Sequence, residues 1–472
     1  MQRELLKESL QPPDTVISLR GIKSVSGHKF FFLSAVLLSL GCYGWIGYEL
    51  HRENFTQLAA ASALLFTSYL FIVLRRATIN FSYLIAAAIL FRLVFLFSIP
   101  ALSDDYFRFI WDGKMISLFH NPYTVLPSTF VRHSKQVNEM VEQLFSAMNS
   151  ANYYTVYPPV CQFIFAASAW VGSSNIFDAV VIIRIICLGT DLGSIILIQK
   201  LLNQLGLPEK NLFWYALNPL VIIELCGNLH FESIMIFFML LAIFLFWKKK
   251  IVFSAIAYGL AISTKIIPLL FLPFLIRRLR WQSTVYFSIT AVTCAILFLP
   301  FLDQALFINL ASSIDLYFRK FEFNASIYYL IRWLGLQAVG YNIINQAGPL
   351  LALGVFISVI ILAMNEKKLT IQNFFVMMQW SLTIYLALAT TVHPWYIVPL
   401  VMMSVFTGYR YPVVWSLMIA LTYATYQTQE NKENLWLTAT EYFSVLIFLG
   451  VEFRDKFFMV LRNKESSTKL KE

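Results

Sequence analysis

Apolar runs of about twenty residues recur along this chain and set the strongest limit on its fold. A helix needs about 20 apolar residues to cross the hydrocarbon core of a bilayer. Hydrophobic residues make up 58% of the 472 positions and charged residues only 13%, so one soluble core could not bury them. The sequence therefore predicts an all-α, polytopic transmembrane helix bundle. The clear runs are 30–50, 55–74, 79–99, 177–199, 211–226, 232–247, 283–301, 346–364, 370–391, 394–408, 412–428 and 436–452.

Two further apolar stretches, 157–172 and 251–278, do not have the pattern of simple spans. The first is short and opens on two prolines, so we expect a helix that dips into the membrane without crossing it. The second is interrupted by Pro268 and Pro273, and proline breaks helices in lipid as in water. We expect a hairpin of two short helices there, with Lys265 near its tip. The expected total is about 13–14 spans.

Short basic clusters between the runs predict which loops face the cytoplasm, because Lys and Arg accumulate on that side. These clusters also account for the net charge of +10, and no basic soluble module that would bind nucleic acid is found. Both termini are then inside, and loops 100–156 and 302–345 are outside. The clusters are Arg20 with Lys23, Arg75–Arg76, Lys200 with Lys210, Lys248–Lys250, Arg277–Arg280, Glu366–Lys368, Arg410 and the C-terminal tail.

The expected organisation follows from these assignments. No cleavable signal peptide is found, and the first apolar run is interpreted as an uncleaved span. The outer loops are expected to carry short interfacial helices. The five cysteines lie in apolar stretches without metal-binding spacing. The expected units are a cytoplasmic leader at 1–29, an N-terminal transmembrane module at 30–301 containing the outer loop 100–156, an outer loop at 302–345, a C-terminal transmembrane module at 346–452 and a cytoplasmic tail at 453–472.

The first outer loop opens with a concentrated group of charges. On a helix, Asp104, Arg108 and Asp112 share one face, with Asp105 beside them. The alternative is a structural helix start with Ser103 as N-cap and Arg108 in a salt bridge. Two adjacent carboxylates are more than a cap requires, which favours a functional role. The same helix is expected to offer apolar surface to the bilayer through Phe107, Ile110 and Trp111.

Two polar sites interrupt apolar sequence on the same predicted face. His230 and Glu232 lie in a short turn between two runs, where an ordinary loop is the alternative, and their spacing gives little support for a metal site. Lys265 is the lone charge in a long apolar stretch. A charge at membrane depth is costly and normally marks a function or a buried partner, although snorkelling to the interface is the alternative. Interhelical pairing is the preferred interpretation for three other charges in apolar runs, Arg92, Arg184 and Asp191.

Two later segments complete the outer set. Arg319 lies in loop 302–345, where aromatic residues alternate with charges in a pattern typical of a membrane-surface segment or of a loop anchored by phenylalanines. His393, Trp395 and Tyr396 follow a predicted span. An aromatic belt would explain Trp395 and Tyr396 but not the histidine.

These residue types together suit a group-transfer reaction at the membrane surface. A carboxylate can take a proton from an acceptor hydroxyl, and Lys265, Arg319 and a protonated His393 can bind a departing phosphate. No glycine-rich nucleotide-binding turn is present, so an activated sugar would reach this site on a lipid phosphate. No cofactor is predicted with certainty, and support for a divalent metal is weak.

Five motifs in order resemble the GT-C superfamily of integral-membrane glycosyltransferases, above all bacterial polyprenyl-phosphate-mannose-dependent mannosyltransferases and the first mannosyltransferase of GPI-anchor synthesis. The resemblance covers roughly residues 80–400. It implies an inverting transfer of a hexose, expected to be mannose, from a polyprenyl-phosphate donor to a lipid- or glycan-linked hydroxyl. The motifs are Asp104-Asp105 through Trp111-Asp112-Gly113 to Asn121-Pro122-Tyr123, then Tyr157-Pro158-Pro159, Asn218-Pro219-Leu220 with Gly227-Asn228 and Glu232-Ser233, Gly259 to Lys265 and Pro268, and His393-Pro394-Trp395-Tyr396.

The resemblance implies that an acid of the first outer loop is catalytic. Asp105 matches the second acid of the family's Asp-x-Asp motif; Ser103 occupies the place of the first, so Asp104 is the other candidate. The resemblance also implies an inner (plasma) membrane location, with the active site on the periplasmic or extracellular face. A lipid-linked-sugar flippase or transporter, and a polymerase or ligase of lipid-linked glycans, are the alternatives. The expected substrate-binding residues are Arg108, Asp112, His230, Glu232, Lys265, Arg319, His393, Trp395 and Tyr396.

Overall fold

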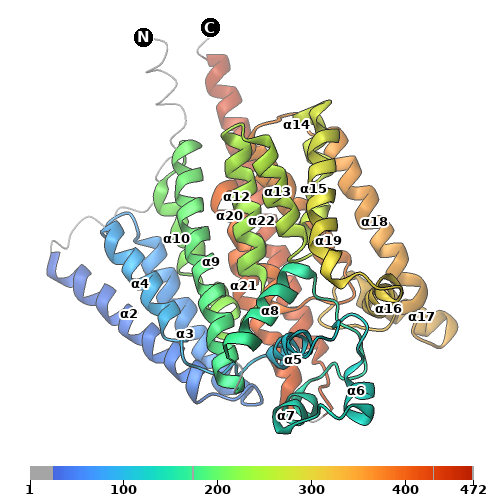
Figure 1. Ribbon diagram of the computed structural model, residues 1–472. Coiled ribbons are helices and arrows are strands. Elements are labelled where there is room, and N and C mark those ends of the chain that lie inside the picture. The colour runs from blue at the N-terminus through green and yellow to red at the C-terminus, as the bar shows by residue number, and fades with distance from the viewer. Residues whose placement is uncertain (1–24, 173–174, 429, 470–472) are drawn as a thin grey trace.

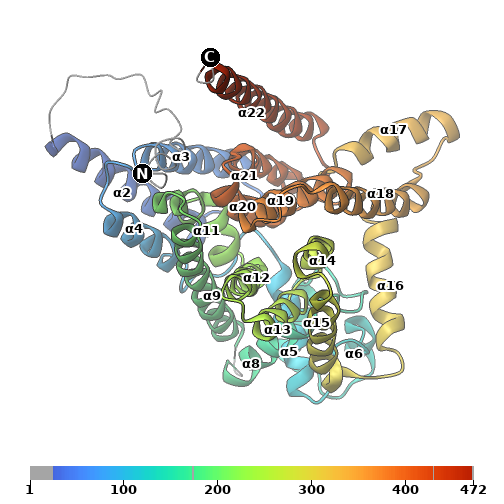
Figure 2. The ribbon, with the colours of Figure 1, turned by 90° about the horizontal axis from the view of Figure 1, so that it is seen from above.

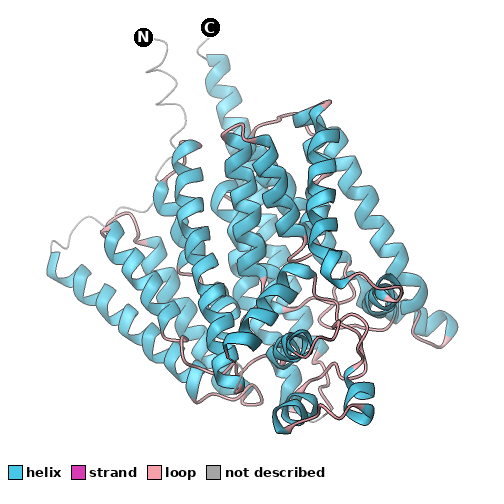
Figure 3. Ribbon diagram, viewed as in Figure 1, coloured by secondary structure: helices cyan, strands magenta, loops and turns pink. Residues whose placement is uncertain are grey.

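The computed structural model describes residues 25–172, 175–428 and 430–469, which form a bundle of helices (Figure 3). No strand is formed within these ranges; an isolated bridge joins Phe323 to Thr391. The all-α prediction is confirmed. Most of the leader predicted at 1–29, and the end of the tail, lie outside the described residues.

Near the N-terminus, α2 packs against α3 and α4 before the first outer loop begins. The loop carries short helices of its own, and α9 then returns through the bundle (Figure 1). The helices of this part are α2 (Val25–Tyr48), α3 (Phe55–Leu74), α4 (Phe81–Leu93), α5 (Asp105–Ser117), α6 (Pro127–His133), α7 (Glu139–Ala147), α8 (Pro159–Val171) and α9 (Ile176–Gln204).

The middle of the chain is broken into many short helices. Prolines occupy the first or second position of several of them, where the missing N–H costs nothing. These helices are η1 (Glu209–Leu212), α10 (Phe213–Ala216), α11 (Pro219–Ile222), the π-helix η2 (Ile223–Gly227), α12 (Glu232–Trp247), α13 (Ile251–Ile262), η3 (Ile267–Phe271), α14 (Pro273–Leu279), α15 (Gln282–Phe298) and η4 (Leu299–Phe301).

The last part of the chain combines long spans with short segments. Figure 2 shows α16 and α17 at the rim of the bundle, and α22 at another edge. The helices are α16 (Leu306–Arg319), α17 (Ile327–Val339), α18 (Ile344–Asn365), α19 (Ile371–Leu388), η5 (Pro394–Ile397), α20 (Val398–Thr407), α21 (Tyr411–Met418), η6 (Ile419–Gln427) and α22 (Leu435–Lys469).

The structure forms fewer long apolar helices than the 13–14 spans expected. Within the described residues, seven helices are long and apolar enough to cross a membrane, or eight if one bent pair counts as a span. Several apolar runs fold instead as broken or short helices: 412–428 divides between α21 and η6, and α4 has only 13 residues. An apolar run indicates that its residues are buried in lipid or in protein. It does not indicate that they form one unbroken helix. The seven are Lys29–Tyr48, Phe55–Leu74, Ile176–Gln204, Gln282–Phe301, Ile344–Asn365, Ile371–Leu388 and Leu435–Lys456.

The two stretches singled out as irregular fold as expected. Helix α8 has 13 residues, about 20 Å at 1.5 Å each, which is too short to cross. Residues 251–278 form α13, η3 and most of α14, with the break at residues 263–266. The two arms are tied together because the Tyr258 hydroxyl donates to the Pro268 carbonyl at 2.8 Å.

The basic clusters assigned to the cytoplasm are joined by contacts at one end of the bundle. Lys210 donates to the backbone of Ala77 at 2.9 Å, next to the Arg75–Arg76 pair. Arg410 lies over the Trp214 ring, as Arg76 does. Figure 1 shows α5, α6 and α7 at the opposite end from α14. The basic clusters and the helices of loop 100–156 therefore lie at opposite ends, in agreement with the parity argument.

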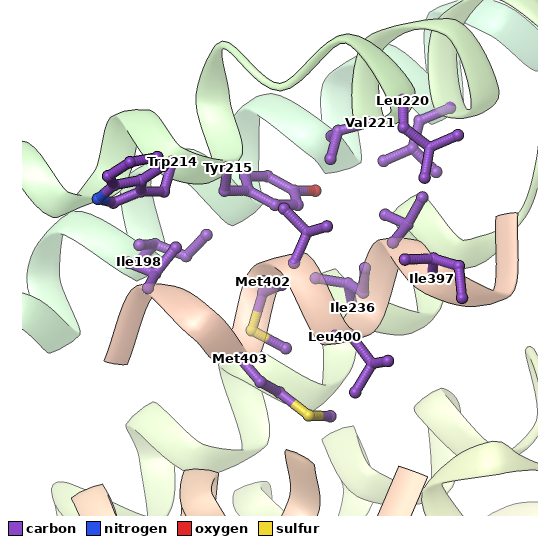
Figure 4. Packing of buried hydrophobic residues seen from close by; sticks show 14 of the residues in the cluster. Ile198, Trp214, Tyr215, Leu220, Val221, Ile236, Ile397, Leu400, Met402 and Met403 are labelled. Carbon is purple, nitrogen blue, oxygen red and sulfur yellow. The ribbon is translucent and has the colours of Figure 1, made fainter. Parts of the chain in front are cut away.

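One apolar core connects the early and late helices. Figure 4 shows Tyr215, Val221 and Ile236 facing Leu400 and Met402 of α20, and all five side chains are buried. This packing holds the broken segment 213–232 against η5 and α20. It thereby fixes the positions of two loops that are far apart in sequence, the one before α12 and the one before η5.

We predict that the end carrying α5–α7 and the end carrying Lys248–Lys250 face opposite sides of the membrane. In a variant lacking the five native cysteines, Ser146→Cys should react with an impermeant maleimide added outside intact cells, because Ser146 is exposed. Lys249→Cys should react only after the membrane is opened. Labelling of position 249 from outside would overturn the assignment of residues 248–250 to the inner side.

Candidate functional site

The site begins at a break in an apolar span. Helices 219–227 and 232–247 meet at a bend of 111°, and the chain between them contains a π-helical turn and Leu229 with a φ of 64°. A non-glycine residue in this left-handed region is uncommon and is typical of functional segments. The break places Glu224 beside His230, which a regular helix would not do.

Arg184 of α9 satisfies the backbone that this break leaves open. Its Nε donates to the Cys226 carbonyl at 2.7 Å, and one terminal nitrogen donates to the Gly227 carbonyl at 3.1 Å. The other terminal nitrogen donates to the Ser98 carbonyl. Non-helical backbone survives at membrane depth only where protein groups satisfy it. The expected interhelical ion pairing is confirmed for Arg92 with Asp191, 2.6 Å apart, but Arg184 binds carbonyls instead.

An imidazole lies between two carboxylates at the bend. Nδ1 of His230 is 2.9 Å from Glu224 Oε2, and its Nε2 is 3.9 Å from Asp105 Oδ2. The shorter contact has ion-pair distance without hydrogen-bond geometry. His230 and Glu224 are buried, whereas the Asp105 side chain is 23% exposed. Asp105 is therefore the member of the row that a substrate can reach.

A stack of four rings runs away from this imidazole. The His230 and Trp395 centroids are 3.7 Å apart, those of Trp395 and His393 are 4.4 Å apart, and Phe323 covers the far side of His393 at 4.9 Å. Backbone hydrogen bonds fix the last pair, because the Phe323 N–H donates to the Thr390 carbonyl and the Phe323 carbonyl accepts from the Val392 N–H. The stack brings the predicted residues of the two loops into contact.

Lys265 lies beside the same group, next to Tyr396. Its ammonium pairs with Glu232 Oε1 and lies 5.9 Å from the Tyr396 ring centroid. The Lys265 side chain is 18% exposed and that of Glu232 is fully buried. The hairpin tip therefore carries a cation with a buried partner, as the cost of an intramembrane charge requires, and leaves part of its surface for a ligand.

His393 is not the cation that the sequence suggested. Burial, with repulsion from His230 and Lys265, lowers the pKa of His393 to about 3. The imidazole is therefore neutral at pH 7 and can donate one hydrogen bond without carrying charge. The prediction of a protonated His393 is wrong because a ring enclosed by other rings loses the hydration that its charged form needs.

The two adjacent acids of the first loop have different partners. Asp104 Oδ2 is 2.6 Å from a terminal nitrogen of Arg52, and Arg52 also lies over the Tyr426 ring at 4.8 Å. Helix α5 begins at Asp105, and Asp104 occupies the N-cap position without a side-chain cap. The Ser103 hydroxyl instead accepts from the Asp105 N–H at 3.3 Å. Asp105 alone of the two acids approaches His230.

Arg108 and Asp112 support the loop rather than reaching the exposed part of the site. They pair at 2.8 Å, and Arg108 also donates to the carbonyls of Ser150 and Tyr153. Asp112 accepts from Gln162 at 3.0 Å. Arg108 is 3% exposed and Asp112 is fully buried, so neither offers surface to a substrate in this structure.

Helix α5 is buried instead of lying on the bilayer. Ile110 and Trp111 are at most 1% exposed, which corrects the expected interfacial orientation, and Phe107 is partly buried. Gly113 makes this packing possible, because a Cβ there would lie 2.1 Å from the Phe165 carbonyl oxygen of α8. Short helices elsewhere in the loop pack over α5. The composition of the loop could not predict this packing.

Arg319 is not brought to the group. It lies at the end of α16, pairs with Asp315 at 2.7 Å and remains half exposed. Figure 2 places α16 along the rim of the bundle.

Several polar residues of the site were missed as candidates. Glu224 was not among the expected site residues, because nothing in its spacing indicated that the bend would place it beside His230. Arg52, Tyr423 and Tyr426 come from segments that were assigned to a loop and to a span. A charge in a very short loop was the available signal for Arg52. Among the described residues, no group of three His, Cys, Asp or Glu is arranged to hold a metal ion.

Fold and site together define an integral membrane protein with a charged and aromatic site at one end of a helical bundle. Residues 32–280 match the family model described as alpha-(1->6)-mannopyranosyltransferase, N-terminal domain. This match covers more than half of the chain, so the chain belongs to that family. The matched region contains Asp105, Glu224, His230 and Lys265, whereas the segment around His393 lies beyond it.

A curated relative agrees with the family. Alpha-(1->6)-mannopyranosyltransferase A of Mycobacterium tuberculosis (strain ATCC 25618 / H37Rv) is 24% identical to this chain over 269 residues. The alignment covers 56% of this chain and 50% of the relative. The chain therefore spans about half the length of the curated relative that it matches.

We predict that Arg184 is required for the broken span. In Arg184→Met, several buried carbonyls lose their donors, at a cost of about 1–3 kcal/mol for each group left unsatisfied. The unfolding temperature in detergent should fall by several degrees. Arg319→Met serves as control, because an exposed ion pair contributes only about 0–1 kcal/mol. Equal unfolding temperatures for the two variants would contradict the role of Arg184.

Proposed function

We propose that this protein transfers a mannosyl group from a polyprenyl-phosphate donor to a hydroxyl of a lipid-linked or glycan acceptor, with inversion at the anomeric carbon. The family description and the name of the relative support mannose as the sugar and favour an α-(1→6) linkage. The observation that carries the proposal is the convergence of Asp105, His230, Trp395 and the Lys265–Glu232 pair at one end of the bundle.

The acceptor side of the reaction is assigned to Asp105. An acceptor hydroxyl becomes a strong nucleophile only as its proton is removed. The carboxylate of Asp105 is partly exposed at the start of α5, where the chain leaves the apolar part of the bundle. It can therefore meet an acceptor that arrives from the aqueous side and a donor held in lipid.

The donor side is assigned to the tip of the hairpin. Negative charge develops on the phosphate as its bond to the sugar breaks, and a fixed cation stabilises that charge. Lys265 supplies the cation, and its pairing with Glu232 holds the side chain in place. The neutral His393 supplies a hydrogen-bond donor in the same neighbourhood. Residues Trp395 and Tyr396 are proposed to contact the sugar or the lipid phosphate. The active site is proposed to face the periplasmic or extracellular side of an inner membrane.

We predict that Asp105→Asn retains the fold and donor binding but loses transfer by about 10²–10⁴, the usual contribution of general base catalysis. The measurement is release of polyprenyl phosphate from polyprenyl-phosphate-mannose by purified protein in detergent, with an octyl α-mannoside as acceptor. Asp104→Asn is the matched comparison, because Asp104 pairs with Arg52 instead of approaching His230. Near-normal transfer by Asp105→Asn with loss in Asp104→Asn would move the role to Asp104.

We predict that Lys265→Met lowers turnover at least about tenfold, since each decade corresponds to 1.36 kcal/mol of transition-state stabilisation. Glu232 is then left as an unpaired buried carboxylate, so the variant should also lose stability. The double variant Lys265→Met/Glu232→Gln removes that unpaired charge and separates the two effects. Restored stability with turnover still low supports phosphate binding, whereas restored turnover would make Lys265 a structural partner only.

A further inference from the structure

Both nitrogens of the buried His230 ring face a carboxylate. Nδ1 is 2.9 Å from Glu224 Oε2 and Nε2 is 3.9 Å from Asp105 Oδ2, and the side chain is only 2% exposed. Neither nitrogen makes a geometrically complete hydrogen bond within the described residues. An imidazole in this position can carry a proton from one side while the carboxylate on the other side balances its charge.

Glu224 is held so that it can act only through this ring. Its Oε1 accepts from the Tyr423 hydroxyl at 2.8 Å, and its Oε2 accepts from Asn228 Nδ2 at 3.0 Å. The side chain is fully buried, so no substrate reaches it. Elements far apart in sequence thus fix a carboxylate behind His230, and a buried carboxylate without such partners would be costly.

The ring itself is held in one orientation. His230 stacks on Trp395 with an interplanar angle of 23°, which prevents the imidazole from turning its nitrogens away from the two carboxylates. An aromatic face also stabilises a cation placed over it. The same contact therefore orients the neutral ring and favours the protonated one.

We propose that Glu224 and His230 form a proton-accepting row behind Asp105, an inference that rests on the proposed function. As the acceptor oxygen bonds to the anomeric carbon, its proton passes to Asp105, and the carbon–phosphate oxygen bond breaks with its electron pair on the phosphate. The proton then moves from Asp105 Oδ2 to His230 Nε2. The carboxylate of Glu224 balances the resulting imidazolium, and the proton returns through the partly exposed Asp105 to water before the next turnover. The 3.9 Å contact must shorten by about 1 Å, as catalytic hydrogen bonds often do when substrate binds.

The test measures kcat and KM for Glu224→Gln, His230→Gln and the double variant with polyprenyl-phosphate-mannose and octyl α-mannoside. We expect each single variant to lower kcat at least about tenfold with KM values nearly unchanged, because both groups act as positioning residues that do not touch the substrate. Because Glu224 acts only through His230, the double variant should be no slower than His230→Gln. Multiplying losses, or a change confined to KM, would overturn the row.

Glu366→Gln is the matched control. This carboxylate is also buried, pairs with Arg278 and lies at the opposite end of the bundle, so it reports the general effect of neutralising a buried glutamate. Its kcat should stay at the native value even if its unfolding temperature falls. If His230→Gln does not fold, the comparison of Glu224→Gln with Glu366→Gln decides, and equal kcat values would overturn the proposal. No turnover by the native protein would instead overturn the proposed function, and with it the row.

Discussion

The capping of a broken span by one buried guanidinium is the constraint on which the site depends. Between residues 219 and 247 the regular helix is broken, and its backbone hydrogen bonds are interrupted. Neither lipid nor buried protein offers water to replace them. Arg184 replaces lost hydrogen bonds by donating to the carbonyls of Cys226 and Gly227 at the bend, and it ties them to the Ser98 carbonyl after α4. Without the hydrogen bonds from Arg184, the segment would be expected to form regular helical hydrogen bonds again. The residues at 224, 230 and 232 would then point in different directions.

The break creates a place where charges can be used at membrane depth. Two ionised groups near the break have partners that are also fixed by packing: Lys265 pairs with Glu232 and Asp104 pairs with Arg52. Asp105 differs because its neighbour, His230, lies beyond hydrogen-bond distance. A paired charge supports structure, whereas a partly exposed carboxylate with a loosely placed neighbour keeps the capacity to accept a proton. This contrast separates the proposed base from the acids that hold the loop.

Aromatic rings connect the proposed acceptor side of the site with the proposed donor side. The stack from His230 through Trp395 and His393 to Phe323 joins the segment before α12 to the segment before η5. It fixes the imidazole that faces Asp105 and removes water from His393, which keeps that ring neutral. A movement of either loop would therefore be transmitted to the acceptor side and to the donor side together.

The sequence by itself determined the all-α membrane bundle, because an apolar run of about twenty residues has few other stable states in water or lipid. It also indicated Asp105, His230 and Lys265 as candidates, because charges and histidines in apolar surroundings are rare without a purpose, and it placed Trp395 and Tyr396 beside His393 in one motif. Tertiary structure alone decided which candidates meet. Arg108, Asp112 and Arg319 have side chains of the same kinds, yet packing directs the first two inward and leaves the third on the rim. Glu224 and Arg184 gain their roles from a bend that no local pattern specifies, since contacts with distant helices determine where a span breaks.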